Sequence, residues 1–232
     1  MPDAHTRTRA ENRRAMEAEI RRLGRAHLST HGAAGLSLRA IARDLGVVSS
    51  AVYRYVPSRD ELLTLLLIEG YTDLADAVDA AVERADPGAP RARLMAAAMA
   101  IRSWAVDDPA RWALLYGSPV PGYAAPADRT VGPGTRVIAR LLRELSAAPS
   151  SGSNPQPDKG FPTELAHDLD AIRTEFGSAL PDTTLLAATT LWATVIGATS
   201  LEVFGQYGAD TFAAPEQLFT AQIDAVLSLI VG

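Results

Sequence analysis

The chain has 232 residues, enough for one small and one larger domain with a sizeable core. It contains no cysteine, which excludes disulfide bonds and thiolate metal sites and is compatible with a reducing compartment. The formal net charge is −5, but residues 1–60 hold 11 Arg and 6 acidic residues, whereas residues 61–232 hold 11 Lys or Arg and 21 acidic residues. The basic charge therefore lies near the N-terminus, where it could neutralise phosphates. A solvated arginine-rich helix is the alternative explanation of this charge.

The N-terminal segment is polar and basic and lacks an apolar run. No later stretch of about 18 uninterrupted apolar residues follows, which is the minimum expected of a membrane-spanning helix. We therefore expect neither export nor a membrane span, and a cytoplasmic protein.

Residues 37–46 predict a short helix that ends in a tight turn. Ser37 is a suitable N-cap, because its hydroxyl can accept a hydrogen bond from an unpaired amide. Leu38, Ile41 and Leu45 follow at helical spacing. Gly46 stands where a helix would end in a left-handed residue, a conformation that glycine adopts without a Cβ penalty.

A second short helix is predicted immediately after that turn. Ser49 or Ser50 can cap it, and Val52 and Val56 then face inward. The side chains left on the outer face are those of Ser50, Ala51, Tyr53, Arg54 and Tyr55. Two helices in this arrangement are typical of a helix-turn-helix, whose second helix lies in the major groove of DNA.

Pro57 ends this second helix, and a third helix starts at once. Ser58 and Glu61 have the spacing of a capping box, in which each side chain bonds to the backbone amide of the other residue. Arg59 lies at the start of this helix, within reach of a DNA phosphate.

The rest of the chain predicts helices and no convincing strand. Residues 117–134 and the Pro/Ser-rich segment 148–162 are expected to be loops. The fold class is therefore all-α, with a three-helix helix-turn-helix domain followed by a larger helical bundle. Beyond the two short helices, the expected helices span residues 8–31, 59–85, 91–106, 109–116, 135–148, 163–176, 182–207 and 215–231.

The stretch GLSLRAIARDLGVVSSAVYRYVPSRDELL, preceded by the His31-Gly32 pair, resembles the N-terminal domain of tetracycline-repressor-like (TetR family) regulators. The resemblance implies a helix-turn-helix DNA-binding domain over residues 1–58 and a ligand-binding and dimerisation domain over residues 59–232. It also implies a homodimer that binds double-stranded DNA at a palindromic operator and responds to a small-molecule effector. Residues implied to contact DNA are Ser37, Arg39, Ser49, Ser50, Ala51, Tyr53, Arg54, Tyr55 and Arg59.

The C-terminal half resembles a subclass of the same family that carries a Trp-x3-His-Gly signature. Trp192 and Gly197 match it, but Ile196 stands in the histidine position, so no ligand chemistry is carried over from that histidine. The last two predicted helices are expected to form the dimer interface, as a four-helix bundle with two helices from each subunit. Packing of these helices within one subunit is the alternative.

The effector pocket is expected among aromatic side chains, which suit amphipathic ligands, although an ordinary helical core is the favoured explanation for each of them taken singly. The candidates are Trp104, Trp112, Tyr116, Tyr123, Trp192, Phe204 and Tyr207. Glu164 and His167 have the spacing of one ligand pair of a di-metal centre, but no second copy is present. We therefore expect no metal, no cofactor and no catalytic residue.

Together these features predict a ligand-responsive, DNA-binding transcriptional regulator, most simply a repressor that a small molecule releases from its operator. An activator role stays open. The alternative from another class is a helical protein that sequesters small molecules, or an enzyme, without DNA binding. Acidic residues at positions 49–55 would favour that alternative, and none is present.

Overall fold

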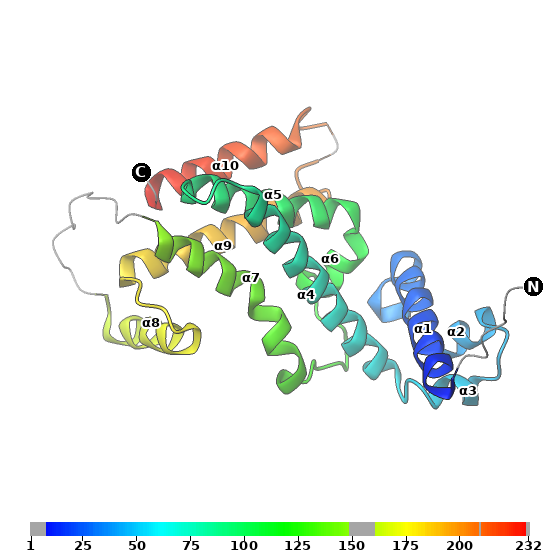
Figure 1. Cartoon of the computed structure of the whole chain (residues 1–232). Coiled ribbons are helices and arrows are strands. Elements are labelled where there is room, and N and C mark those ends of the chain that lie inside the picture. The colour runs from blue at the N-terminus through cyan, green and yellow to red at the C-terminus, as the bar shows by residue number, and fades with distance from the viewer. Residues whose placement is uncertain (1–7, 149–160, 209, 231–232) are drawn as a thin grey trace, which may run out of the picture. The chain divides into compact units, whose positions relative to one another are not determined.

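The computed structural model describes residues 8–148, 161–208 and 210–230. Within these ranges the regular elements are helical and no strand forms, which confirms the all-α class (Figure 1). The elements are α1 (Arg9–His31), the 3-10 turn η1 (Ala33–Gly35), α2 (Leu38–Asp44), α3 (Ser49–Tyr53), α4 (Arg59–Arg84), α5 (Pro90–Asp107), α6 (Pro109–Tyr116), α7 (Ala127–Ala147), α8 (Thr163–Phe176), α9 (Asp182–Val203) and α10 (Pro215–Ile230).

The chain forms two compact units. The first unit comprises the residues up to Tyr71 together with Pro109–Gly132, and the second comprises Thr72–Asp108 together with the residues from Pro133 onward. Helices α4 and α7 therefore each contribute residues to both units. The domain boundary expected between residues 58 and 59 stays a prediction.

The core of the first unit lies among α1, α2, α3 and the start of α4. Ile20 of α1, Ile41 of α2 and Val52 of α3 are each at most 1% exposed, and Leu63 and Leu66 of α4 belong to the same apolar cluster. Burying each such side chain contributes about 1.5–3 kcal/mol. Helices as short as α2 and α3 are not stable alone in water, so this shared core is what keeps them folded.

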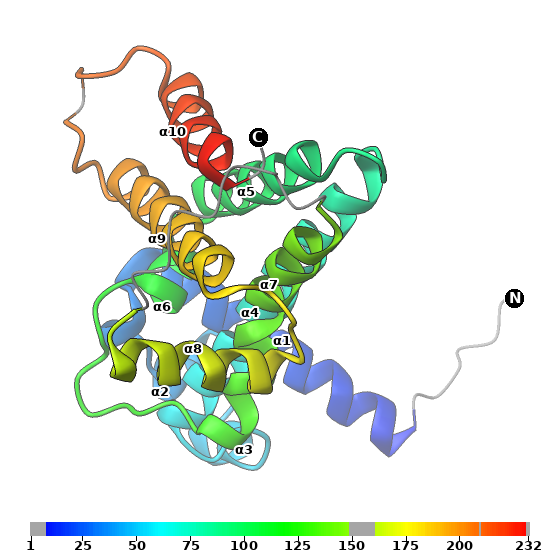
Figure 2. The same ribbon diagram turned by 90° about the vertical axis from the view of Figure 1, so that its left-hand side faces the viewer.

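In the second unit, α5, α9 and α10 lie side by side (Figures 1 and 2). Ile101, Leu191 and Ile223, one from each helix, are at most 1% exposed. Arg102 of α5 joins the other two helices as well, because its guanidinium donates two hydrogen bonds of 2.8 and 2.6 Å to Glu202 of α9 and one of 3.2 Å to Glu216 of α10.

Helix α7 starts eight residues before the predicted position, and the prediction of a loop through residue 134 was wrong in this respect. The helix begins at Ala127 and includes Pro133, whose ring nitrogen cannot donate a helical hydrogen bond. A contact distant in sequence favours the early start: Arg129 donates two hydrogen bonds, of 2.7 and 2.9 Å, to Glu61 of α4. Arg129 thereby holds the pKa of the Glu61 carboxyl below its usual value.

Helix α9 ends at Val203 rather than at the predicted Tyr207. Gly205 has a φ of 67°, a left-handed conformation that ends a helix and that glycine adopts without strain. Helix α9 is also long and apolar enough to cross a membrane by length and composition, a test that a core helix passes equally well. Because it packs against α5, α8 and α10, its composition fits that of a packed helix.

Candidate DNA-binding surface and effector cavity

Helix α2 begins as the sequence predicts. Ser37 is its N-cap, and the Ser37 hydroxyl accepts a hydrogen bond of 3.4 Å from the amide of Ala40. Arg39 follows on the first turn with an exposed side chain. The Ser37 hydroxyl keeps its own proton, so it can still donate to a phosphate oxygen.

The turn between α2 and α3 also follows the prediction. Gly46 has a φ of 69°, the left-handed conformation expected at the end of α2. The amide of Val47 donates to the carbonyl of Ala42 at 3.0 Å, and the Val47 side chain packs against the core of the first unit. This turn fixes the direction in which α3 leaves α2.

The predicted serine cap of α3 was wrong. The N-cap is Val48, and no side chain caps this helix end. Ser49 and Ser50 lie inside the first turn of α3, so neither hydroxyl is used for capping and both are left for another partner. Because α3 enters its first turn one residue earlier than a Ser49 cap would allow, the helix covers Ser49–Tyr53.

The inner and outer faces of α3 are separated as predicted. Val52 and Val56 are at most 1% exposed and belong to the core of the first unit. Ser50, Tyr53 and Arg54 are exposed, and Tyr53 has 43% of its surface accessible. Side chains able to donate and accept hydrogen bonds thus form the outer face of a helix whose inner face is anchored.

Two predicted DNA contacts already have partners within the protein. Tyr55 is half-buried against the core, and the guanidinium carbon of Arg13 lies 5.5 Å from the centre of its ring. Arg59 donates hydrogen bonds of 3.0 and 3.2 Å to the carbonyls of Ala33 and Ala34 in η1. Arg59 therefore braces η1 against the start of α4, and its other terminal nitrogen lies 3.7 Å from the carboxylate of Asp60.

Sequence reasoning missed Val48. This N-cap residue is 72% exposed, next to the exposed face of α3. An apolar side chain in that position can contact the methyl group of thymine. The signal was the Val47-Val48 pair, of which only one can pack inward at the end of a short turn.

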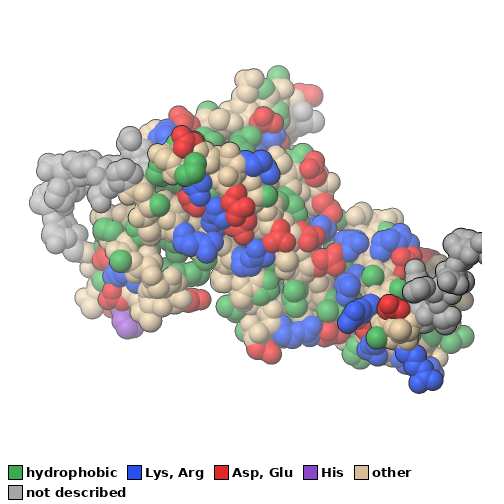
Figure 3. Space-filling view, viewed as in Figure 1, with side chains coloured by type: hydrophobic (Ala, Val, Ile, Leu, Met, Phe, Trp, Pro, Cys, Tyr) green, Lys and Arg blue, Asp and Glu red, His purple; other side chains and the backbone are tan. Residues whose placement is uncertain are grey.

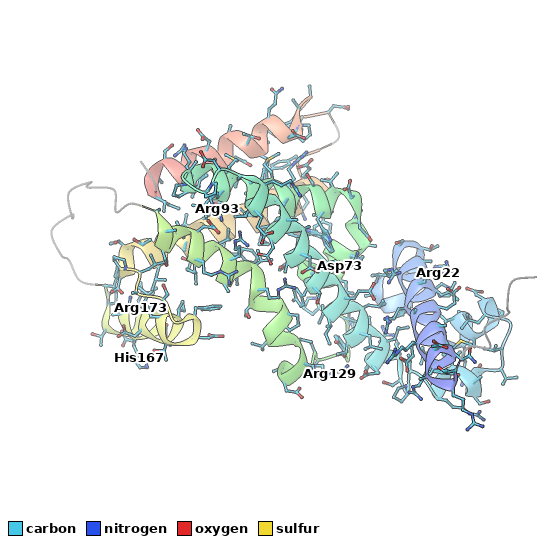
Figure 4. All side chains as sticks on the ribbon, viewed as in Figure 1. Arg22, Asp73, Arg93, Arg129, His167 and Arg173 are labelled. Atoms are coloured by element: carbon cyan, nitrogen blue, oxygen red, sulfur yellow. The ribbon has the colours of Figure 1, made fainter. Side chains whose placement is uncertain are left out.

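The second unit contains a cavity of about 320 Å³ between α7, α8 and α9. Its walls are mostly apolar, which is typical of sites for small molecules. Helix α8 packs against α9. Arg173 of α8, labelled in Figure 4, fixes the start of α9 by donating to Asp182 at 2.5 Å. The lining residues are Thr135, Ile138, Leu141, Leu142, Ile172, Glu175, Phe176, Leu185, Ala188, Thr189 and Trp192.

Of the aromatic candidates for ligand binding, Trp192 lines this cavity, and Phe176 was not among the candidates. Trp112 is fully buried in the first unit, and its ring lies tilted against that of Tyr116 with the ring centres 4.5 Å apart. Burial raises the pKa of Tyr116. The Tyr123 hydroxyl lies 2.9 Å from that of Thr64. The remaining candidates lie outside the cavity walls: Trp104 on α5, Phe204 at the end of α9, and Tyr207, whose hydroxyl accepts from Gln222.

The wall helix α7 is tied to α4 by a run of ion pairs, here called the α4–α7 ladder and made of Asp76, Asp79, Arg136 and Arg140. Arg136 donates to Asp76 at 2.7 Å and to Asp79 at 3.1 Å, and Arg140 donates to Asp79 at 2.7 Å. Acidic and basic side chains lie interleaved over this part of the second unit (Figure 3). The two helices are thus joined at several points along their length.

Glu144, one helical turn beyond Arg140 on α7, extends the ladder to α5. It accepts from Arg140 at 2.8 Å and from Arg93 of α5 at 2.5 and 3.1 Å. Burial by itself would raise the pKa of Glu144, but the hydrogen bonds from Arg93 and Arg140 bring that pKa below its usual value. The carboxylate is therefore stabilised in its charged form although its side chain is only 8% exposed.

Comparison with known proteins agrees with this fold. Residues 20–66 match the family model "Bacterial regulatory proteins, tetR family", and residues 94–226 match the model "Tetracyclin repressor-like, C-terminal domain". The HTH-type transcriptional regulator Rv1816 of Mycobacterium tuberculosis is 51% identical over 222 residues, which cover 96% of this chain and 95% of that protein.

Solved structures with the same fold include the crystal structure of SCO4313, described as a regulatory protein. It matches with a TM-score of 0.78 and 33% identity, over 96% of this chain and 100% of that one. A protein from Rhodococcus sp. RHA1 matches with a TM-score of 0.66 over the whole of both chains, and at 23% identity it supports the fold alone. The chain belongs to the tetR family and is a DNA-binding transcriptional regulator.

Proposed function

We propose that this protein is a cytoplasmic, homodimeric repressor that leaves a palindromic operator when a small-molecule effector binds to its second unit. The observation that carries this proposal is the outer face of α3, where Ser50, Tyr53 and Arg54 are exposed while Val52 anchors the helix in the core. A helix of this kind enters the major groove with its side chains against base edges, and two copies meet half-sites about 34 Å apart.

The predicted contacts divide into two classes. Ser49, Ser50, Ala51, Tyr53 and Arg54 lie on α3 or at its end and are proposed to meet base edges, where an arginine bonds best to guanine. Ser37, Arg39, Tyr55 and Arg59 are proposed to hold the DNA backbone, which positions the protein without reading sequence.

Helices α9 and α10 are proposed to form the dimer interface. Large apolar side chains are exposed on both helices: Leu186, Leu201 and Phe204 on or next to α9, and Leu229 on α10. Leu229 has 83% of its surface accessible. On α9 the small residue Ala193 lies on the same exposed side, which allows close helix contact.

The cavity between α7, α8 and α9 is proposed to hold the effector. A ligand shifts an equilibrium between two conformations only through its different affinity for them. Because α7 lines the cavity and is joined to α4 by the α4–α7 ladder, a displaced α7 would pull on α4, and α4 continues through Tyr71 into the first unit.

The proposed function is tested by selecting sequences from a pool of random duplex DNA with the purified protein at physiological salt. We expect one palindromic motif whose half-sites lie about one helical turn apart. A folded dimer that retains no DNA above background would contradict the proposal and favour a protein that sequesters small molecules.

The dimer interface has its own test. Leu201→Glu should convert the dimer to monomers in sedimentation velocity at micromolar concentration, because it places a charge in the apolar contact. Val106→Glu is the matched control, since Val106 is an exposed apolar residue of α5 in the same unit. Unchanged dimers in the Leu201 variant would place the interface elsewhere.

A further inference from the structure

The charges around the cavity disfavour an anionic ligand. Glu175 is the one charged residue among the eleven that line the cavity. The neighbouring Arg173 is not available, because its guanidinium donates to Asp182 and Asp170 and to the carbonyl of Leu180. A carboxylate or phosphate in this space would lose its hydration without gaining a cation, which is costly.

Two polar groups of the cavity, those of Glu175 and Thr189, are suited to accept hydrogen bonds. An ionised Glu175 can only accept. The Thr189 hydroxyl already donates its proton to the carbonyl of Leu186 at 2.7 Å, so towards a ligand it too can only accept. A ligand that satisfies both groups must therefore carry donors.

The apolar walls and the size of the cavity restrict the rest of the ligand. Ile138, Phe176 and Trp192 offer aliphatic and aromatic surface on three different helices. The volume of about 320 Å³ is near the lower end of the range of about 300–1,000 Å³ that is usual for small-molecule sites. Glu175 is exposed, so it lies where the cavity meets solvent.

We propose that the effector is a compact hydrophobic amine, with its ammonium group bonded to Glu175 at the mouth of the cavity and its apolar body against Phe176 and Trp192. This inference rests on the proposal that the cavity is the effector site. An ammonium supplies N–H donors for the acceptor oxygens of Glu175 and Thr189. It is also attracted to the faces of aromatic rings.

Three probes of similar skeleton test the ligand class: 2-phenylethylamine, 2-phenylethanol and 3-phenylpropanoate. Titrated calorimetrically into the full-length protein at neutral pH, the amine should bind at least about tenfold tighter than the alcohol, and the carboxylate should bind weakest. A carboxylate that binds as tightly as the amine, or no binding by any of the three, would overturn the proposal.

Variants on α8 test the role of Glu175. Glu175→Gln should weaken amine binding about five- to tenfold and leave the affinity for the alcohol unchanged, because only the charge is removed. Glu164→Gln is the matched control: Glu164 is an exposed carboxylate of the same helix that does not line the cavity. Equal amine affinity in both variants would remove Glu175 from the site.

Failure of this inference is distinguishable from failure of the proposed function. If a palindromic motif is selected but no probe binds, the regulator stands and the ligand class is wrong. If the amine binds through Glu175 without changing affinity for the selected DNA, the ligand class stands and its role as effector is wrong.

Discussion

The surface formed by α2 and α3 uses arginine differently from the second unit. On and around α2 and α3, Arg39, Arg43 and Arg54 are exposed and, within the described part of the chain, form no ion pair. In the second unit, by contrast, Arg102 and Arg140 are at most 8% exposed and hydrogen-bonded to carboxylates. The same side chain is thus left for phosphates and bases where acidic neighbours are few, and becomes a structural tie where they are many.

The largest effect is expected from removing a carboxylate that pairs with arginines of the second unit. Glu144→Leu should destabilise the protein by about 3 kcal/mol, because it leaves the buried Arg140 and the half-buried Arg93 without their shared partner. Urea denaturation followed by circular dichroism measures this change. Glu83→Leu is the control, since Glu83 is 72% exposed and lies 3.9 Å from Arg140, a distance at which an exposed pair contributes less than about 1 kcal/mol. Equal losses of unfolding free energy in the two variants would show that burial does not make Glu144 more important for stability than Glu83.

The next largest effect is expected at the exposed arginines around α3, which form no ion pair in the described part of the chain. Arg54→Ala should weaken binding to the selected operator by about 1–3 kcal/mol if the guanidinium reads a guanine, and should relax specificity at that position. Arg84→Ala, at an exposed arginine of α4 in the second unit, should leave DNA affinity within error. Fluorescence anisotropy over a range of salt concentrations separates the two possible contacts, because a phosphate contact also lowers the salt slope by about 1.

The pKa of Glu144 decides how the stabilisation from its ion pairs with Arg93 and Arg140 changes with pH. This pKa is lowered in the folded protein, so the stabilisation from Glu144 is present above the unfolded-state pKa of about 4.3 and is lost as pH falls through the folded value. The difference in unfolding free energy between the natural protein and Glu144→Gln should therefore be constant near pH 7 and shrink below about pH 4. A difference that grows towards low pH would contradict the lowered pKa.

The smallest effect on stability is expected from substituting the serines at the starts of α2 and α3. Ser37→Ala should cost about 0.5–2 kcal/mol of stability, because the Ser37 hydroxyl caps α2. Ser50→Ala should change stability by less than about 0.5 kcal/mol, because no side chain caps α3. Thermal unfolding of both variants measures the contrast. If Ser50 proves as costly as Ser37, its hydroxyl has a structural partner after all.

What the sequence could predict depended on how local the cause was. Ser37, Gly46 and the Val52–Val56 spacing act within a few residues, and all three lie as predicted. The early start of α7 could not be predicted, because Glu61 and Arg129 stand 68 residues apart in the chain.

The cavity escaped prediction for a related reason. Its walls come from three helices, and aromatic content alone cannot tell Trp192, which lines the cavity, from Trp112, which is fully buried in the first unit. Aromatic candidates chosen by residue type can therefore be divided into cavity-lining and core residues only when the packing of the helices is known. The exposed face of α3 is easier to predict because Ser50 and Tyr53 lie within one short helix.

Helix α7 carries its two roles on opposite sides, with Ile138 and Leu142 facing the cavity and Arg136 and Arg140 facing α4. If this cavity holds the effector as proposed, substitutions on the first side change which molecule fits, while the charged side still joins α7 to α4. A lineage of such regulators can therefore acquire new chemical signals by drift at a few apolar positions and keep the same response. The same separation gives a protein engineer a defined set of positions at which to build a sensor for a chosen compound.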